Sequence, residues 1–112
     1  MSTYKEKADK VFGFVATLSK ENPGIAQGFA TLHKTVGQDG ALSGKEKELI
    51  ALGIGIAIHC EGCIACHVQD ALKAGATKEE IFETIGVTVL MGGGPAVTYG
   101  QKAYEALEEF SK

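Results

Sequence analysis

Nine consecutive residues hold most of the reactive side chains of this chain: HCEGCIACH, at positions 59–67. They include all three cysteines and two of the three histidines. Three kinds of site fit such a cluster, namely a redox-active dithiol, a metal site and a buried structural patch. Two features distinguish among these three kinds of site. They are the spacing of the side chains and the helices on which the side chains are expected to lie.

The spacing of Cys60, Cys63 and His67 suits a redox-active dithiol beside a base. If the chain is helical from Cys60 onward, a rotation of about 100° per residue places all three side chains within an arc of about 60°. Backbone N–H groups and the dipole at a helix start favour the thiolate over the thiol, whose ordinary pKa is about 8.5. The second thiol can then resolve a sulfenic acid or a mixed disulfide formed on the first. His67, four residues after Cys63, is within reach to accept its proton.

A metal site made from the same segment is disfavoured by geometry. Zinc needs about four ligands that converge tetrahedrally. On one regular helix the four candidate ligands fan outward and cannot surround one ion; they are Cys60, Cys63, Cys66 and His67. We therefore predict neither a bound metal nor another cofactor. Cys66 points about 60° further round than Cys63 and is interpreted as a small buried side chain.

Glu48 is the candidate carboxylate for relaying the protons of the thiols. It is the last charged residue before the ten-residue apolar stretch LIALGIGIAI, so it is expected at the edge of a dry pocket, where carboxylate pKa values shift readily. In a continuous helix the twelve residues from Glu48 to Cys60 would span about 18 Å, so the chain must bend between them. We predict the bend near Gly62. Of the other histidines, His33 is interpreted as structural or exposed, and His59 as a loop residue or an accessory base.

Apolar residues recur mostly three or four positions apart, which predicts an all-α fold. We expect about six helices, bounded by capping and turn residues, over 2–20, 23–37, 43–58, from within 60–63 to about 75, 77–90 and 95–110. Asn22 is expected to cap the second helix, while Ser43 and Thr77 open the third and fifth through capping boxes. The helix over 43–58 is apolar nearly all round after Glu48. This pattern predicts the centre of a bundle or part of a subunit interface.

The length of the chain indicates how many domains it forms, and its charge excludes some classes of partner. A chain of 112 residues is expected to form one domain, 1–112. A formal charge of −3 with acidic and basic residues interspersed predicts no nucleic-acid partner and no polybasic membrane anchor. The N-terminus lacks the pattern of a signal peptide and the apolar run over 49–58 is too short to cross a bilayer, so we expect no membrane partner and a cytoplasmic location. Cytoplasmic thiols are normally reduced, which favours catalysis or metal binding over structural disulfides.

The order of the reactive residues resembles that of a known family. Glu48, eleven residues, Cys60-x-x-Cys63, three residues and His67 resemble the alkylhydroperoxidase AhpD-like core of the carboxymuconolactone decarboxylase family. The resemblance covers residues 43–107, including ATKEEIFETIGVTVLMGGGPA. It implies an all-helical bundle that assembles as a homo-oligomer, a trimer or hexamer, with its sites near subunit interfaces. In peroxidase members a histidine stands between the two cysteines, where this chain has Gly62.

The resemblance also implies roles for the site residues in a peroxiredoxin-type thiol peroxidase or disulfide reductase. Cys63 would become the sulfenic acid during hydroperoxide reduction, and Cys60 would donate a proton and then close the disulfide. Glu48 and His67 would relay protons. The substrate would be a hydroperoxide or a disulfide, and the reductant a thiol protein or a lipoyl or thioredoxin-like donor. Two alternatives stay open: a cofactor-free carboxymuconolactone decarboxylase-type lyase, against which the C-x-x-C pair counts, and a metal-binding or assembly module.

Overall fold

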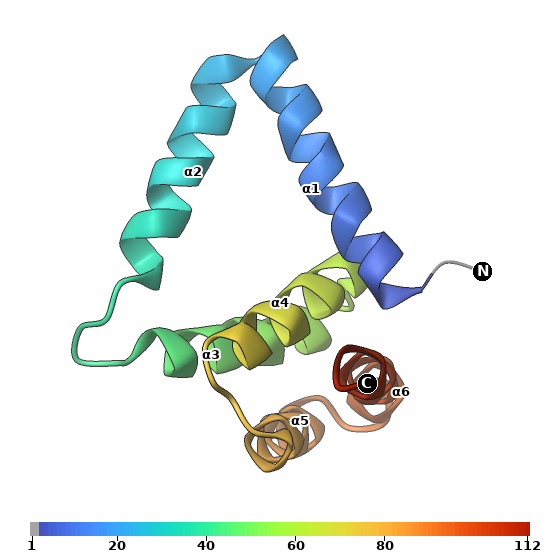
Figure 1. The fold of residues 1–112 in the computed structure, drawn as a ribbon. Coiled ribbons are helices and arrows are strands. Elements are labelled where there is room, and N and C mark those ends of the chain that lie inside the picture. The colour runs from blue at the N-terminus through green and yellow to red at the C-terminus, as the bar shows by residue number, and fades with distance from the viewer. Residues whose placement is uncertain (1–2) are drawn as a thin grey trace.

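Six helices follow one another along residues 3–112, the part of the chain that the computed structural model describes (Figure 1). Their bounds are α1 Tyr4–Glu21, α2 Pro23–Gly37, α3 Gly44–Ala57, α4 Glu61–Lys73, α5 Lys78–Gly92 and α6 Gly94–Phe110. Residues 3–112 contain no strand, so the prediction of an all-α fold with about six helices is confirmed. The predicted start of the first helix, Ser2, lies outside the described residues.

Local capping chemistry sets most of the helix starts. Ser43 and Thr77 each form the predicted capping box, in which the N-cap side chain and a glutamate three residues later satisfy one another's backbone N–H groups. Pro23 and Pro95 lie in the first turns of α2 and α6, as predicted. Asn22 occupies the N-cap position of α2, but its side chain makes no capping hydrogen bond, so that part of the prediction is wrong.

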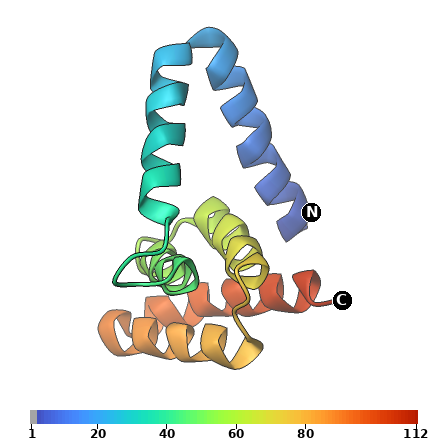
Figure 2. The ribbon, with the colours of Figure 1, turned by 60° about the vertical axis from the view of Figure 1, so that its left-hand side comes forward.

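The helices are arranged as a four-helix body with a projecting hairpin. α3 and α4 pack against one another, α5 and α6 cover one side of this pair, and α1 lies against the other side of α4. Figures 1 and 2 show α1 and α2 as a V-shaped hairpin whose apex projects away from the other four helices. Within residues 3–112 no helix combines the length and the apolar character that a membrane crossing needs.

The core lies where α3 and α4 meet their neighbours. Its largest fully buried side chains are Leu52, Ile56, Ile64, Val68, Ile81 and Leu107. α3 is therefore central in the bundle, as its apolar sequence predicts. Its other face remains open on the single chain, because Ile50 is 50% exposed and Ile54 is 55% exposed. An apolar face of this kind is what the alternative interpretation, a subunit interface, requires.

The close approach of α3 to α4 gives a stability prediction at two glycines of α3. A Cβ atom at Gly55 would lie 3.1 Å from the Cβ of Cys63, whereas one at Gly53 would lie 3.6 Å from its nearest neighbour, in Thr84. Alanine gains up to about 1 kcal/mol of helix propensity over glycine, while overpacking costs about 1–3 kcal/mol. We therefore expect Gly53→Ala to exceed Gly55→Ala in free energy of unfolding by about 1–3 kcal/mol. Urea unfolding of the two variants measures this, and equal values would contradict the packing.

Candidate functional site

Cys60 and Cys63 lie together at the start of α4. Cys60 is the N-cap residue in an extended conformation, and its Sγ accepts a hydrogen bond from the backbone N–H of Cys63 at 3.2 Å. The two half-buried cysteines are joined in a disulfide, with their Cα atoms 5.2 Å apart. The prediction that the two sulfurs are neighbours at a helix start holds. The helix begins at Glu61, within the predicted range of 60–63, and Cys60 is the residue that caps it.

The bend that brings Glu48 toward the cysteines lies at His59 rather than at Gly62. His59 has a φ of 60°, in the left-handed region, whereas Gly62 lies within the first turn of α4. The N–H of His59 donates to the carbonyl of Ile56 at 3.2 Å, and the N–H of Cys60 donates to the carbonyl of Gly55 at 2.9 Å. These are the two hydrogen bonds of a Schellman motif, which ends a helix through one left-handed residue.

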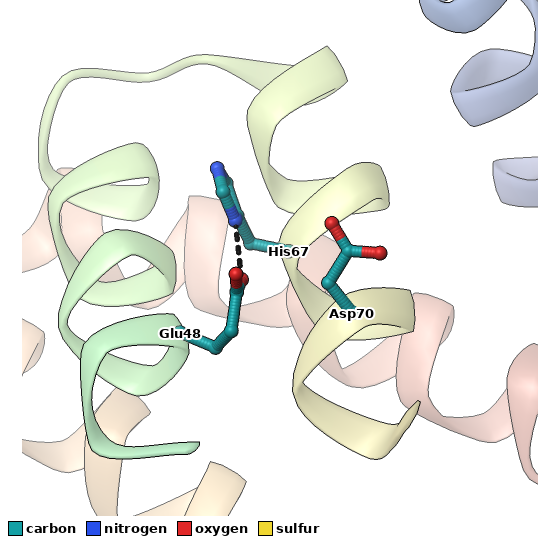
Figure 3. Close-up of side chains that lie close together, drawn as sticks. All are labelled: Glu48, His67 and Asp70. Atoms are coloured by element: carbon teal, nitrogen blue, oxygen red, sulfur yellow. Dashed lines mark hydrogen bonds and ion pairs between the residues drawn. The ribbon is translucent and has the colours of Figure 1, made fainter. Parts of the chain in front are cut away.

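The turn at His59 makes α3 and α4 run back along one another and pairs Glu48 with His67. Nδ1 of His67 lies 2.7 Å from Oε2 of Glu48, and the two side chains are 23% and 19% exposed. Figure 3 shows the second ring nitrogen pointing toward the end of the helix pair where α3 and α4 are joined. That end carries Cys60 and Cys63. One imidazole nitrogen thus faces the end of the helix pair that carries the cysteines, while the carboxylate holds the other.

Asp70, which sequence reasoning missed, belongs to the same cluster. It follows His67 by three residues on α4, and one donor atom each from Glu48, His67 and Asp70 lie within 4.8 Å of one another (Figure 3). Within residues 3–112 this is the one group of three or more such side chains close enough to hold a metal ion. Burial, followed by the charge of Glu48, raises the pKa of the Asp70 carboxyl. The i, i+3 spacing from His67 was the available signal, because such residues share a helix face.

The remaining candidate residues lie outside the disulfide. Cys66 is a free, buried thiol, and burial raises its pKa, which confirms its interpretation as a small buried side chain. His33 is exposed on α2, as predicted. The side chain of His33 lines a cleft of about 290 Å³ that lies between the α1–α2 hairpin and α4. Cys66, His67 and Asp70 line the same cleft. His59 is an exposed turn residue whose ring stacks on Tyr99, with centroids 4.4 Å apart.

The raised pKa of Asp70 predicts that its charge destabilises the metal-free fold at neutral pH. A carboxyl group whose folded pKa lies above its unfolded value weakens the fold as pH rises between the two values, and the cost persists above the folded pKa. Asp70→Asn is therefore expected to raise the Tm at pH 7 in the presence of EDTA. The gain should vanish near pH 3, where the wild-type carboxyl is also neutral. Thermal unfolding at both pH values tests this, with the exposed Asp9→Asn as control; a lower Tm for Asp70→Asn at pH 7 would contradict it.

Comparison with known proteins identifies the family to which this chain is similar. Residues 23–109 match the carboxymuconolactone decarboxylase family. A crystal structure of an apo protein of that family from Legionella pneumophila has a TM-score of 0.94 with this chain, at 43% identity over 97% of each chain. A family protein from Thermotoga maritima has a TM-score of 0.83 at 27% identity, over 94% of this chain and 90% of its own.

Two curated relatives are described as uncharacterized. One, from Cupriavidus necator, is 32% identical over 103 residues, which cover 92% of this chain and 88% of the relative. The other, from the cox locus of Paracoccus denitrificans, is 38% identical over 91 residues, covering 81% of this chain and 82% of the relative. The similarity thus extends over most of each chain.

Proposed function

Because this chain belongs to the carboxymuconolactone decarboxylase family, with an AhpD-like C-x-x-C pair, we propose that it is a thiol-dependent oxidoreductase. As a single domain over 1–112 it would cycle Cys60 and Cys63 between dithiol and disulfide, reducing a hydroperoxide or a disulfide substrate. One observation carries the proposal. The two cysteines are paired at the start of α4, and the same helix carries His67, whose ring is hydrogen-bonded to Glu48 of α3.

The reaction with a hydroperoxide needs only the chain's own thiols. The Cys63 thiolate attacks the outer peroxide oxygen, so an S–O bond forms, the O–O bond breaks and the alcohol leaves with a proton. Cys63 is then a sulfenic acid. The Cys60 thiolate attacks the sulfur of Cys63, an S–S bond forms, and the hydroxyl leaves as water with a second proton. Two thiols and one hydroperoxide thus become one disulfide, one alcohol and one water.

The local geometry supports these roles. The N–H of Cys63 that donates to the sulfur of Cys60 favours a negative charge on Cys60, as the resolving thiolate requires. Cys63 lies in the first turn of α4, where the helix dipole favours a thiolate. His67 follows it by one helical turn and would accept its proton and return it to the leaving alcohol. Glu48 holds the imidazole through Nδ1 and fixes the orientation of the ring.

The catalytic cycle requires a reductant and a reducing compartment. A thiol protein, or a lipoyl or thioredoxin-like donor, would reopen the disulfide by thiol–disulfide exchange. We place the protein in the cytoplasm, where such donors keep cysteines reduced. Assembly as a homo-oligomer, a trimer or hexamer, is supported by an apolar groove of about 380 Å³ between α3 and α5. Its lining includes the exposed residues Ile50, Ile54, Val87 and Met91.

The test is a stoichiometric oxidation of the reduced protein in EDTA. One equivalent of an organic hydroperoxide is expected to remove two of the three thiols, and mass spectrometry of the digest should find Cys60 joined to Cys63 with Cys66 still free. A thiol count that stays at three would overturn the proposal. Decarboxylation of a carboxylated lactone by protein with every cysteine alkylated would favour the lyase instead.

A further inference from the structure

Glu48, His67 and Asp70 form a half-buried trio with two carboxylates, and the proposed redox reaction gives a role to only one of them, Glu48. Glu48 is paired with His67, whereas Asp70 makes no ion pair among residues 3–112. The two carboxylates lie on facing helices, with the imidazole within 4.8 Å of both (Figure 3). Two like charges held this close, away from full solvation, favour the binding of a cation between them.

The donor set fits a divalent transition metal, with zinc as the reference ion. We propose that Glu48, His67 and Asp70 form a zinc-type site, with one carboxylate oxygen, one imidazole nitrogen and one further carboxylate oxygen as ligands. Zinc accepts nitrogen and oxygen ligands at about 2.0–2.2 Å and keeps a fourth position for water in open sites. Two carboxylates balance its charge of two. A tetrahedral site of that size separates its ligand atoms by about 3.3 Å. Binding would therefore open the 2.7 Å contact between His67 and Glu48 and close the wider spacings, which are at most 4.8 Å.

The position of the trio provides access for the ion. His67 and Asp70 line the cleft of about 290 Å³ between the α1–α2 hairpin and α4, so hydrated metal and a water ligand can reach them from solvent. All three residues are partly buried rather than fully exposed, which limits competition from bulk water. The site is separate from the sulfurs, because Cys60 and Cys63 are tied in the disulfide and Cys66 is not a member of the trio.

Binding would regulate the dithiol reaction. A metal on His67 and Glu48 occupies both groups of the proposed proton relay, so oxidation of the thiols would slow while the ion stays bound. This consequence rests on the proposed function, whereas the binding itself does not. A test on the oxidised protein therefore separates the two, since the disulfide removes the thiolates that would otherwise bind zinc more strongly.

The experiment is equilibrium dialysis of zinc against oxidised, tag-free Cys66→Ser protein, with Asp70→Asn as the ligand variant and Asp9→Asn as control. We expect about one zinc per chain in the parent protein and in Asp9→Asn, because Asp9 is an exposed residue paired with Lys5. Affinity should fall at least about tenfold in Asp70→Asn. Thermal unfolding supplies a second readout, in which a given zinc concentration raises the Tm of the parent by more than that of Asp70→Asn.

Two outcomes would overturn the inference. One is a zinc stoichiometry near zero in the oxidised parent protein, and the other is an unchanged affinity in Asp70→Asn. Because Asp70→Asn should be at least as stable as the parent in EDTA, weak binding by this variant would not reflect unfolding. Failure of peroxide oxidation in EDTA, with zinc binding intact, would instead reject the proposed function and leave the site standing.

Discussion

Replacing Cys63 with serine is expected to slow peroxide consumption by at least about 100-fold, to the level of a variant lacking both cysteines of the pair. A serine hydroxyl is not ionised at neutral pH, and without the Cys63 sulfur neither the sulfenic acid nor the disulfide can form. Stopped-flow measurement of organic hydroperoxide loss reports the effect. Cys66→Ser is the matched control, because Cys66 is buried outside the disulfide, and it should keep the wild-type rate.

The same series distinguishes the two sulfurs of the pair. Cys60→Ser should still consume one equivalent of peroxide and should accumulate a sulfenic acid on Cys63 that dimedone traps. Wild-type consumption by Cys63→Ser would remove Cys63 from the reaction. A trapped sulfenic acid on Cys60 in that variant would reverse the proposed order of the two thiols, and the hydrogen bond from the N–H of Cys63 to Cys60 would then mark the attacking sulfur.

The second large effect is expected at the proton relay. His67→Gln should slow oxidation of the dithiol by about 10²–10⁴-fold, the usual contribution of a general acid–base group. Glu48→Gln should slow it less, because the imidazole remains in place without its carboxylate. The double variant should be no slower than His67→Gln, since Glu48 acts only through His67. The measurement is the rate of thiol loss in EDTA with one equivalent of hydroperoxide.

A surface histidine provides the control for the relay. His33→Gln removes an exposed imidazole of α2 and is expected to leave the rate unchanged. Full activity in His67→Gln would show that the thiol proton leaves by another route. Additive losses in the double variant would show that Glu48 acts on the reaction independently of His67.

Features fixed by neighbouring residues could be predicted from the sequence. The capping boxes at Ser43 and Thr77 depend on side chains three residues apart, and the structure contains both. The proximity of Cys60 and Cys63 likewise follows from a spacing of one helical turn. Glu48 was predicted to join the cysteine cluster only if the chain bends, because residues nineteen positions apart, such as Glu48 and His67, meet only when the chain turns back.

Features that depend on backbone strain or on distant contacts could not be predicted from the sequence. Glycine is the usual left-handed residue at a helix end, so Gly62 was the natural choice for the bend, yet His59 adopts this conformation. Asp70 carries no motif of its own and acquires its setting only when α4 packs on α3 beside Glu48. The separation of the α1–α2 hairpin from the body also has no local signal, because its apolar residues show ordinary helical spacing (Figure 2).

The most direct test of the central claim is the pH dependence of alkylation of each cysteine in the reduced protein, followed by mass spectrometry. A helix start and a nearby imidazole should give at least one thiol of the pair a pKa clearly below the ordinary value of about 8.5. Cys66, whose pKa is raised by burial, should react only at higher pH. If Cys60 and Cys63 both titrated at or above about 8.5, they would be inert structural thiols, and a redox function for this pair would be contradicted.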